Sequence, residues 1–526
     1  MPSMISLKGL SGMRLEKLIQ GMNLRHHAGP EDAAITELSD DSRTVTAGAL
    51  FLSRGQSAER QNHIRQALER GAAAVISEPI DYPNFPVDIP WFQHDRVDQH
   101  LAGTLAERFF GEPAKRLALI GITGTNGKTT TSLLIQHLLQ HAGIQTGVIG
   151  TIYTDDGTEA GRRTASLTTP GAIEFSRELA RMADAGCKAV VAEVSSHALE
   201  QGRAGALSFQ AAVFTNLTQD HLDYHKTMEA YAKAKSILFQ QLAPDGCAIL
   251  NRDDPHARQV LAGRQGPTWW TTLKESEPRA SITLCRASEI SLRAGDSTAR
   301  FTGPWGDIKA NLPLVGEHNI CNTLQAIAAA HSISNLSDSL CEALQAIPQV
   351  PGRLEKVTYI PPSNEAPPPD DEPRAVLVDY AHTPDALVNA LSALRPVTTG
   401  KLIVMFGCGG DRDKTKRPLM AQAACQFADE IFLTSDNPRT EDPEQIIRDA
   451  TEGVPDDKKN DLTILPDRAA AIRASVLTGQ AGDTVLLAGK GHEDYQTIGT
   501  DNIHFDDREH AASALELWTQ KRSART

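Results

Sequence analysis

The stretch that decides the fold of this 526-residue chain reads Ile122-Thr123-Gly124-Thr125-Asn126-Gly127-Lys128-Thr129, and it continues into Thr130 and Thr131. An apolar run over residues 117–122 precedes it and an amphipathic run over residues 132–141 follows it. This order predicts a strand, a glycine-rich turn and a helix start, where backbone N–H groups and the helix dipole favour phosphate. Lys128 adds a charge for the outer phosphates, and the Thr129 hydroxyl can reach a magnesium ion. We therefore predict that the chain binds a nucleoside triphosphate.

The loop departs from the common phosphate-binding pattern at one position. Ile122 stands where that pattern has a glycine, while Gly121 comes one residue earlier and Gly124 lies inside the loop. The alternative interpretation is an ordinary glycine turn with Lys128 in solvent. The strand before the loop and the helix after it favour phosphate binding.

Length and composition indicate a globular protein of several domains. At the usual domain size the chain corresponds to about three or four domains, and 40% apolar with 22% charged residues is typical of globular chains. The net charge, 52 minus 66 or −14, argues against a broad nucleic-acid or anionic-membrane surface. Seven scattered cysteines without a C-x-x-C pair indicate reduced thiols in a cytoplasmic protein. Neither a membrane-length apolar run nor a signal peptide is evident, so we expect no membrane insertion.

The order of expected elements predicts an α/β protein with three domains. Residues 1–112 alternate short strands (49–53 and 72–77) with a helix at 63–70. Residues 113–348 repeat strand and helix around a central parallel sheet of the phosphate-loop type, with an additional small β region between residues 267 and 314. Residues 349–526 carry strong strands with helices between them, which predicts a Rossmann-like doubly wound domain. The proline-rich, acidic segment 361–373 is predicted to be an exposed loop.

Other strands and helices are expected from apolar runs and helical spacing. The strands are 148–152, 189–194, 211–214, 281–285, 299–302, 375–379, 402–406, 430–435 and 484–488, and the helices are 227–242, 319–331, 418–428 and 467–477.

Polar residues follow the central strands at the edge where ligands of parallel sheets bind. Glu193 ends one strand and is suited to hold magnesium, although it could instead cap the next helix. Asp220, His221, Asp223 and His225 suggest metal or phosphate contacts, and the absence of a nearby thiolate does not favour zinc. The alternative for this second cluster is a polar helix entry.

Lys235 lies on a helix face that otherwise points inward. Met228, Tyr231, Lys235 and Leu238 share that face at helical spacing. Such a lysine can extend its amine to solvent. It can also be a desolvated amine with a lowered pKa, which is available for covalent chemistry.

The expected C-terminal strands also end in polar clusters. Arg412 and Arg439 can clamp a carboxylate in bidentate fashion, and Glu493 can pair with an ammonium group. Together these side chains would suit a zwitterionic amino acid. Ordinary ion pairs within loops are the alternative for each.

Five motifs in this order resemble the Mur ligase family of ATP-dependent enzymes that build the peptidoglycan stem peptide. They are Gly124-Thr-Asn-Gly-Lys-Thr129, Glu193-Val-Ser-Ser-His197, Asp220-His-Leu-Asp-Tyr-His225, Asp379-Tyr-Ala-His-Thr-Pro384 and Gly489-Lys-Gly-His-Glu493. A sixth, Asp436-Asn437-Pro438-Arg439, is similar to the motif of members that add meso-diaminopimelate, where the arginine meets the distal carboxylate. Lysine-adding relatives generally lack it.

The resemblance implies roles for individual residues. It implies catalytic roles for Lys128, Glu193, His221 and Lys235, the last as a carbamate that helps hold magnesium with Thr129, Glu193 and His221. The implied ATP contacts are Gly124, Thr125, Asn126, Gly127, Lys128, Thr129, Thr130, Asn319 and Arg353. The implied contacts to the UDP-linked substrate are Ser42, Thr168, Thr169, Ser195, Gln201 and Arg203. The implied diaminopimelate contacts are Arg412, Asp436, Asn437, Pro438, Arg439, Gly489 and Glu493.

The implied reaction joins meso-diaminopimelate to UDP-N-acetylmuramoyl-L-alanyl-D-glutamate through an acyl phosphate, with ATP and Mg²⁺, in a monomeric cytoplasmic enzyme whose domains close. The sequence departs from the family at Leu167, in the loop 55–62 and in the insertion after Ile360. A folylpolyglutamate-synthase-like ligase shares the loop, but the motifs for the UDP substrate and Asp436–Arg439 argue against it. A GTPase would need lysine where Arg252 follows Asn251, and a purely structural role leaves the strand-end clusters unexplained.

Overall fold

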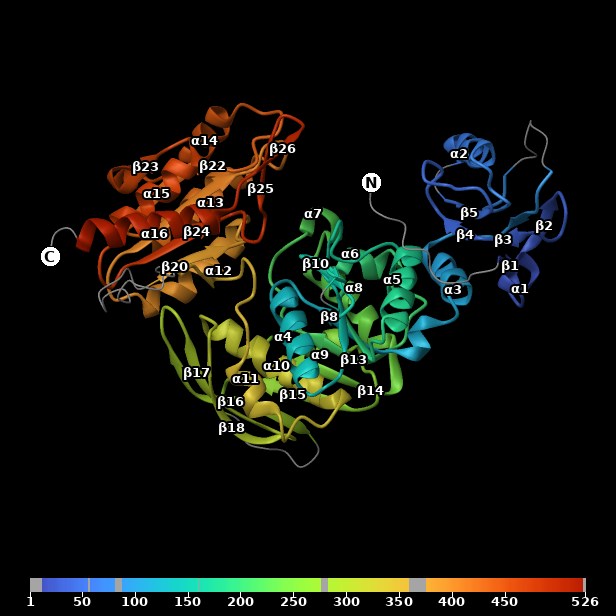
Figure 1. Cartoon of the computed structure of the whole chain (residues 1–526), viewed down its shortest axis with the longest axis horizontal. Coiled ribbons are helices and arrows are strands. Elements are labelled where there is room, and N and C mark those ends of the chain that lie inside the picture. Colours follow the sequence, from blue (N-terminus) through green and yellow to red (C-terminus); the bar gives the residue numbers. More distant parts are fainter. Residues whose placement is uncertain are drawn as a thin grey trace. The chain divides into compact units, whose positions relative to one another are not determined.

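The computed structural model describes residues 12–54, 57–80, 88–158, 160–275, 282–358 and 375–523. The chain divides into two compact units (Figure 1). The first comprises Met1–Thr271, Glu277–Leu284 and Gln325–Leu336, and the second comprises Thr272–Ser276, Cys285–Leu324 and Ser337–Thr526. The division into three domains with boundaries near residues 112 and 348 stays a prediction.

The first unit begins with a five-stranded sheet. Its order is β2 (Arg25–Ala28), β7 (Trp91–Gln93), β6 (Ala74–Ser77), β5 (Ala49–Ser53) and β4 (Glu37–Ser39), and only β2 is antiparallel to its neighbour. Alternate residues of β5 enter different cores: Phe51 packs in a cluster with Ile64 of α2 (Ser57–Glu69), and Leu50 in another with Leu101 of α3 (Gln99–Phe109). Residues 12–35 add β1 (Met13–Arg14), α1 (Leu15–Ile19) and β3 (Ala34–Ile35).

The phosphate loop lies in a larger, mainly parallel sheet of the same unit. Parallel strands follow the order β9 (Thr146–Ile149), β12 (Ala189–Glu193), β8 (Ala118–Thr123), β13 (Phe209–Phe214), β14 (Leu242–Asn251) and β15 (Thr268–Thr272). The short strands β10 (Tyr153–Asp155) and β11 (Arg163–Thr164) extend it beyond β9 in antiparallel fashion. The helices are α4 (Lys128–His141), α5 (Ala172–Asp184), α6 (Ser196–Glu200), α7 (Leu222–His225), α8 (Met228–Gln240) and α9 (Ala257–Leu261). Strands β8 and β12 are almost wholly buried, as expected when helices cover both faces of a parallel sheet.

The second unit contains a second parallel sheet. Its order is β19 (Glu355–Lys356), β20 (Ala375–Asp379), β24 (Thr484–Ala488), β21 (Leu402–Cys408), β22 (Glu430–Ser435) and β23 (Leu462–Ile464), with only β19 antiparallel. Two apolar clusters bury its strands with α12 (Pro384–Leu394), α13 (Lys416–Phe427) and α14 (Pro443–Thr451), or with α15 (Arg468–Thr478) and α16 (Asp507–Ser523). Most of the antiparallel strands β16 (Thr283–Leu292), β17 (Ser297–Gly303) and β18 (Gly306–Leu312) belong to this unit, as does the start of α10 (Glu317–Ile333) before α11 (Leu340–Gln345). A hairpin of β25 (Tyr495–Ile498) and β26 (Asp501–His504) follows β24.

The predicted α/β class, the parallel phosphate-loop sheet, the small β region and the doubly wound C-terminal sheet are all confirmed. The strand expected at 148–152 is placed wrongly, because β9 ends at Ile149 and the chain turns back into β10. Helix α4 begins at Lys128, four residues before the amphipathic run, because Gly127 turns the chain there. The acidic segment 361–373 lies outside the described residues.

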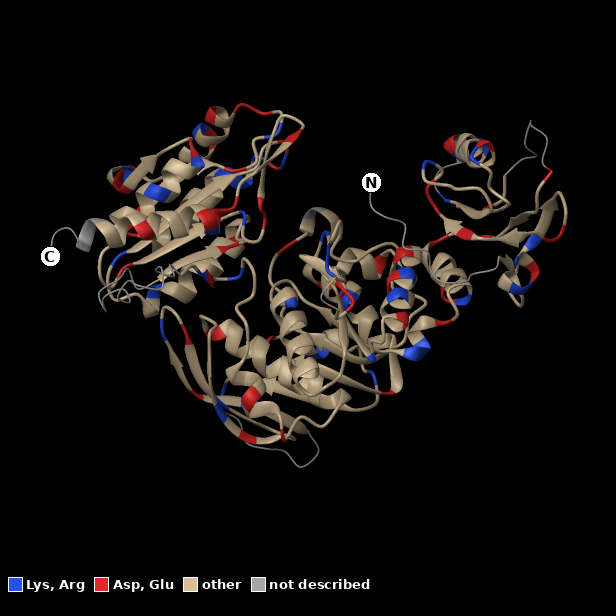
Figure 2. Ribbon diagram, in the orientation of Figure 1, with Lys and Arg blue, Asp and Glu red and all other residues tan. Residues whose placement is uncertain are grey.

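Charge is mixed over both units. Figure 2 shows basic and acidic residues interspersed along the ribbon rather than collected into one basic stripe. In the described part of the chain, no helix is long and apolar enough to cross a membrane.

Candidate active site

The phosphate loop has a backbone that requires its glycines. Gly127 has φ +85° directly before α4, and Gly124 has φ +154°. A Cβ atom on Gly124 would lie 1.8 Å from the Oγ1 atom of Thr215, which follows β13. The Lys128 amine donates hydrogen bonds to the carbonyls of Gly124 and Thr125, both at 2.9 Å. The loop is therefore closed around its lysine, with Thr129 and Thr130 buried in the first turn of the helix.

Glu193 lies beside the loop threonine. The Thr129 hydroxyl donates to Oε2 of Glu193 at 3.0 Å, and Thr151 donates to the same carboxylate through its N–H (3.0 Å) and its hydroxyl (2.9 Å). Glu193 is buried and does not cap α6, because the Ser195 side chain performs that role. Carboxylate and hydroxyl oxygens are ligands that Mg²⁺ prefers, so this pair fits a magnesium site.

The predicted contacts to the UDP substrate join the same network. Thr169 donates to the Glu193 carbonyl at 2.8 Å and accepts from the Ser195 N–H at 3.1 Å. Arg203 donates to the Thr169 carbonyl at 2.9 Å and twice to the Gln201 side chain. Thr168 is 3.1 Å from the Thr151 hydroxyl.

Ser42 is positioned separately from these residues. It follows β4, in the five-stranded sheet, and donates to Gln66 at 2.6 Å. Within the described chain, no hydrogen bond connects Ser42 with the network around Glu193. Its predicted role therefore concerns another part of the ligand.

Lys235 is fully buried beneath the aromatic ring of Tyr231. Its amine lies 4.3 Å from the ring centroid, and among the described residues it makes no hydrogen bond or ion pair. Burial holds the pKa of the Lys235 amine well below its usual range; the Lys128 charge acts in the same direction and Asp220 acts against both. The Lys235 amine is therefore desolvated and does not extend to solvent.

Tyr231 links Lys235 to the phosphate loop. Its hydroxyl lies 3.3 Å from Oγ1 of Thr125, and burial raises its pKa to about 12. The His221 ring meets the Tyr231 ring edge-on at 6.2 Å and the His197 ring at 4.9 Å. The structure therefore brings Lys128, Thr129, Glu193, His221 and Lys235 to one edge of the sheet.

His221 and its cluster form a helix entry as well as a site. His221 has φ +54° at the start of α7 and is half exposed, with Nε2 3.5 Å from Asp220. His225 is buried, 2.9 Å from the Ser196 hydroxyl and 3.3 Å from Glu200. In the described residues no group of three or more His, Cys, Asp or Glu side chains is arranged to hold a metal ion.

Asn251 and Asp254 support the loop after β13. Asn251 donates to the Thr215 carbonyl at 2.9 Å, and the Asp254 carboxylate accepts from the Leu217 N–H at 2.7 Å.

In the second unit, the loops after β22 and β24 converge. Asn437 donates to Glu493 at 3.1 Å and accepts from the Lys490 amine at 3.1 Å and from the Thr497 N–H at 2.9 Å. Asp436 is buried, and its Oδ1 atom makes no hydrogen bond within the described chain. Burial raises the pKa of Glu493, while the Lys490 charge opposes that shift.

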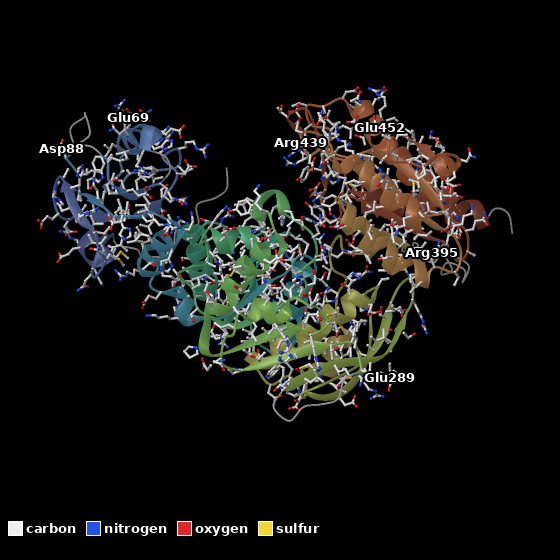
Figure 3. The ribbon with its side chains drawn as sticks, turned by 180° about the vertical axis from the view of Figure 1, so that it is seen from behind. Glu69, Asp88, Glu289, Arg395, Arg439 and Glu452 are labelled. Carbon is white, nitrogen blue, oxygen red and sulfur yellow. The ribbon has the colours of Figure 1, made fainter. Side chains whose placement is uncertain are left out.

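Two arginines flank this acidic group. The Arg439 guanidinium donates to the Gly410 carbonyl at 2.7 Å, and Arg412 is exposed beside Gly409. Arg439 has φ +53°, a strained backbone that the hairpin fixes from both sides: its N–H donates to Thr497 at 3.1 Å and its carbonyl accepts from Gly499 at 2.8 Å. Arg439 lies on the opposite side of this unit from Arg395 (Figure 3).

The predicted ATP residues Asn319 and Arg353 lie in the second unit and not in the phosphate loop's unit. Asn319 is buried and bonded to the Val315 carbonyl at 2.8 Å. The Arg353 guanidinium lies 4.9 Å from the centre of the Tyr380 ring. Asp379 accepts from Leu354 and Ala381, and burial raises its pKa. Gly489, with φ +118°, donates its N–H to the Asp379 carbonyl at 3.0 Å, so these loops share one edge.

Some residues of these sites were not predicted as site residues. Thr151 lies beyond Ile149, where β9 ends, although the sequence predicts that this strand continues to residue 152. Gln496 donates to the Asp436 carbonyl and lies on a hairpin that was not predicted. Lys490 lies inside the motif Gly489-Lys-Gly-His-Glu493, so the sequence contained a signal that could have selected it as a site residue. Arg468 gave no signal, because its partner Asp507 is 39 residues away.

Fold and sites together define an α/β protein of the phosphate-loop class, with a cluster of acidic and basic side chains in its second unit. The pattern of the Mur ligase middle domain matches residues 122–330, and that of the Mur ligase glutamate ligase domain matches residues 369–491. Two proteins named UDP-N-acetylmuramoyl-L-alanyl-D-glutamate–2,6-diaminopimelate ligase are each 41% identical to this chain. The match to the protein from Trichormus variabilis covers 96% of this chain and 99% of that protein. The match to the protein from Geobacillus kaustophilus covers 93% of this chain and 96% of that protein. A solved structure of a ligase with the same name has a TM-score of 0.66 at 33% identity, over 96% of this chain and 99% of that one. This chain belongs to the Mur ligase family.

A folylpolyglutamate synthase from Mycobacterium tuberculosis shares the fold. Its TM-score is 0.56 at 18% identity, and the match covers 78% of this chain and 93% of that one. At that identity the similarity shows the fold alone and adds no support to a folate-related function.

Proposed function

We propose that this chain is an ATP-dependent ligase that joins meso-diaminopimelate to UDP-N-acetylmuramoyl-L-alanyl-D-glutamate for peptidoglycan synthesis, acting as a monomer in the cytoplasm. The observation that carries the proposal is the cluster in which Asn437, beside Asp436, donates to Glu493, with Arg439 two residues further along the same loop; it brings an amide, two carboxylates and an arginine together. An amino acid with a second ammonium and a second carboxylate satisfies that set. L-Lysine would leave Arg439 without a carboxylate partner.

The first unit supplies the groups for phosphoryl transfer. Loop N–H groups and Lys128 hold the phosphates of ATP, and Thr169, Ser195 and Arg203 position the nucleotide-linked dipeptide near Glu193. The terminal phosphate passes to the D-glutamate γ-carboxylate and ADP leaves. Catalysis rests on position and charge, because phosphoryl transfer needs little covalent help from protein groups.

Magnesium bound by Thr129, Glu193, His221 and a carbamate on Lys235 would neutralise the charge that develops on the phosphate. The low pKa of Lys235 supports the carbamate, because a neutral amine can react with carbon dioxide. Intact-protein and peptide mass spectra in bicarbonate test this point, since the added mass should lie on Lys235 and disappear in Lys235→Met.

The second unit presents the amine that completes the reaction. With its distal carboxylate on Arg439 and its distal ammonium beside Asp436 and Glu493, the other amine of diaminopimelate is free to attack the acyl phosphate. The tetrahedral intermediate then collapses to the amide and phosphate.

Phosphate release tests the whole proposal. Release should require ATP, the nucleotide-linked dipeptide and meso-diaminopimelate together, and mass spectrometry should find the tripeptide product. Equal turnover with L-lysine would contradict the substrate assignment, and release without the dipeptide would contradict the ligase reaction.

A further inference from the structure

The Lys490 amine occupies the centre of the acidic group in the second unit. Its side chain has 0% exposed surface, and the amine lies 3.1 Å from Oδ1 of Asn437, 3.4 Å from Oε2 of Glu493 and 3.7 Å from Oδ1 of Asp436. The Tyr495 ring is 5.5 Å away. A fully buried lysine requires such partners, because an unpaired ammonium away from water is unstable.

We propose that Lys490 is the positioning residue that fixes the diaminopimelate pocket for a second ammonium group, and that it acts through Asn437 and Glu493 rather than by touching the substrate. The inference rests on the proposed function. Its first basis is the orientation of one amide. Lys490 and the Thr497 N–H both donate to Oδ1 of Asn437, which directs Nδ2 toward Glu493.

A flipped Asn437 amide would oppose these contacts. Its N–H groups would then face two donors, and its oxygen would face the Glu493 carboxylate, so three favourable contacts would become unfavourable ones. Without Lys490, only the Thr497 N–H would still donate to Oδ1 of Asn437. Lys490 therefore supplies one of the three contacts that set the orientation of the Asn437 amide, and the only one from a charged donor.

The second basis is the charge balance. Asp436 and Glu493 carry two negative charges and Lys490 carries one positive charge, which leaves the group with one negative charge when all are ionised. The Oδ1 atom of Asp436 is buried and makes no hydrogen bond in the described chain. An incoming ammonium would supply the charge that balances the cluster.

Removal of Lys490 would take away the ammonium that pairs with both carboxylates. Two such groups cannot both stay ionised easily, so one takes up a proton. The charge of the cluster would then be redistributed, and the Asn437 amide would be held by Thr497 and Glu493 alone. Binding of the second ammonium should weaken, whereas the binding of ATP and of the nucleotide-linked dipeptide should be unchanged.

The experiment compares meso-diaminopimelate with 2-aminopimelate, which keeps both carboxylates and one amine but lacks the second ammonium. Lys490→Met should raise KM for meso-diaminopimelate at least about tenfold, with kcat much less changed, and should reduce the preference for it over 2-aminopimelate by a similar factor. KM for ATP and for the dipeptide should stay as in wild type. The control is Lys401→Met, which removes an exposed lysine paired with Glu430 at 2.6 Å in the same unit.

Unchanged KM and preference in a folded Lys490→Met protein would overturn the inference. If that variant does not fold, Lys490→Gln, which keeps a polar side chain but removes the charge, replaces it and should show the same rise in KM and the same loss of preference; unchanged values would overturn the inference. A wild-type protein that does not use meso-diaminopimelate refutes the proposed function, whereas an active wild type with an unchanged variant refutes only the role of Lys490.

Discussion

The ion pair between Arg468 and Asp507 offers the sharpest test of how the amino-acid pocket is supported. Both side chains are fully buried; Nε of Arg468 donates to Oδ1 of Asp507 at 2.8 Å, and Nη2 reaches Oδ2. The same guanidinium donates to the carbonyls of Ala488 (3.1 Å) and Ser435 (3.3 Å), the last residues of β24 and β22. It therefore ties α15, α16 and the two strands whose loops form the pocket.

Arg468→Met should destabilise the second unit by about 3–5 kcal/mol, because it leaves a buried carboxylate without its partner. Asp507→Leu should destabilise the second unit by a similar amount, because it leaves the buried Arg468 guanidinium without its carboxylate partner. Arg468→Met/Asp507→Leu should cost no more than either single change, because neither charge is left alone, so the coupling should be about 3 kcal/mol.

Urea unfolding measures these costs through Trp518, which lies on α16 and donates to the Gly479 carbonyl at 3.2 Å. Fluorotryptophan labelling separates its NMR signal from the other four tryptophans, so the transition belongs to the second unit rather than to the whole chain. The control is Arg395→Met, which removes a partly exposed arginine that also joins a carboxylate (Asp429) to two carbonyls. A cost below about 1 kcal/mol for Arg468→Met, the range of surface pairs, or additive costs in the double variant, would refute the reasoning.

Two further predictions concern the phosphate loop and the pH dependence. Gly124→Ala should weaken ATP binding at least about tenfold in calorimetry, because its Cβ would overlap Thr215; Gly143→Ala, at φ +78° with open space around it, is the control and should bind ATP normally. Burial lowers the pKa of His492 to about 4, so the unfolded chain binds more protons and stability should fall as pH drops from about 6.5 to 4. His492→Gln should flatten that fall, and an unchanged slope would contradict the assignment.

The sequence predicts the sheets well because parallel strands are buried on both faces. Residues 189–192 and 402–408 are continuous apolar runs, and each lies in a wholly buried strand. The hairpin of β25 and β26 gave no such signal, because β26 is exposed along its whole length. Its importance comes from backbone contacts to Arg439, which residue types do not reveal.

The site residues divide in the same way. Glu193 ends a strand, Arg439 lies in the loop after one, and Lys235 lies on the inward face of a helix, so strand ends and helical spacing could select these three candidates. Side chains that hold site residues could not be selected in this way, because their partners are distant in sequence: Thr151 bonds Glu193 across 42 residues, and Lys490 bonds Asn437 across 53. Long-range hydrogen bonds depend on strand order, which no local pattern contains.

Both sites orient an acidic group through a neighbour that comes from another strand. In the first unit, the hydroxyls of Thr151 and Thr129 donate hydrogen bonds to the Glu193 carboxylate. These bonds fix the orientation of the carboxylate, and a cation could take the place of the donated protons. In the second unit, Lys490 and Thr497 orient Asn437 toward Glu493. A carboxylate held in this way loses little conformational freedom when its ligand arrives, which favours binding. Substitution of the holding residue should therefore change ligand affinity even where it leaves the fold intact.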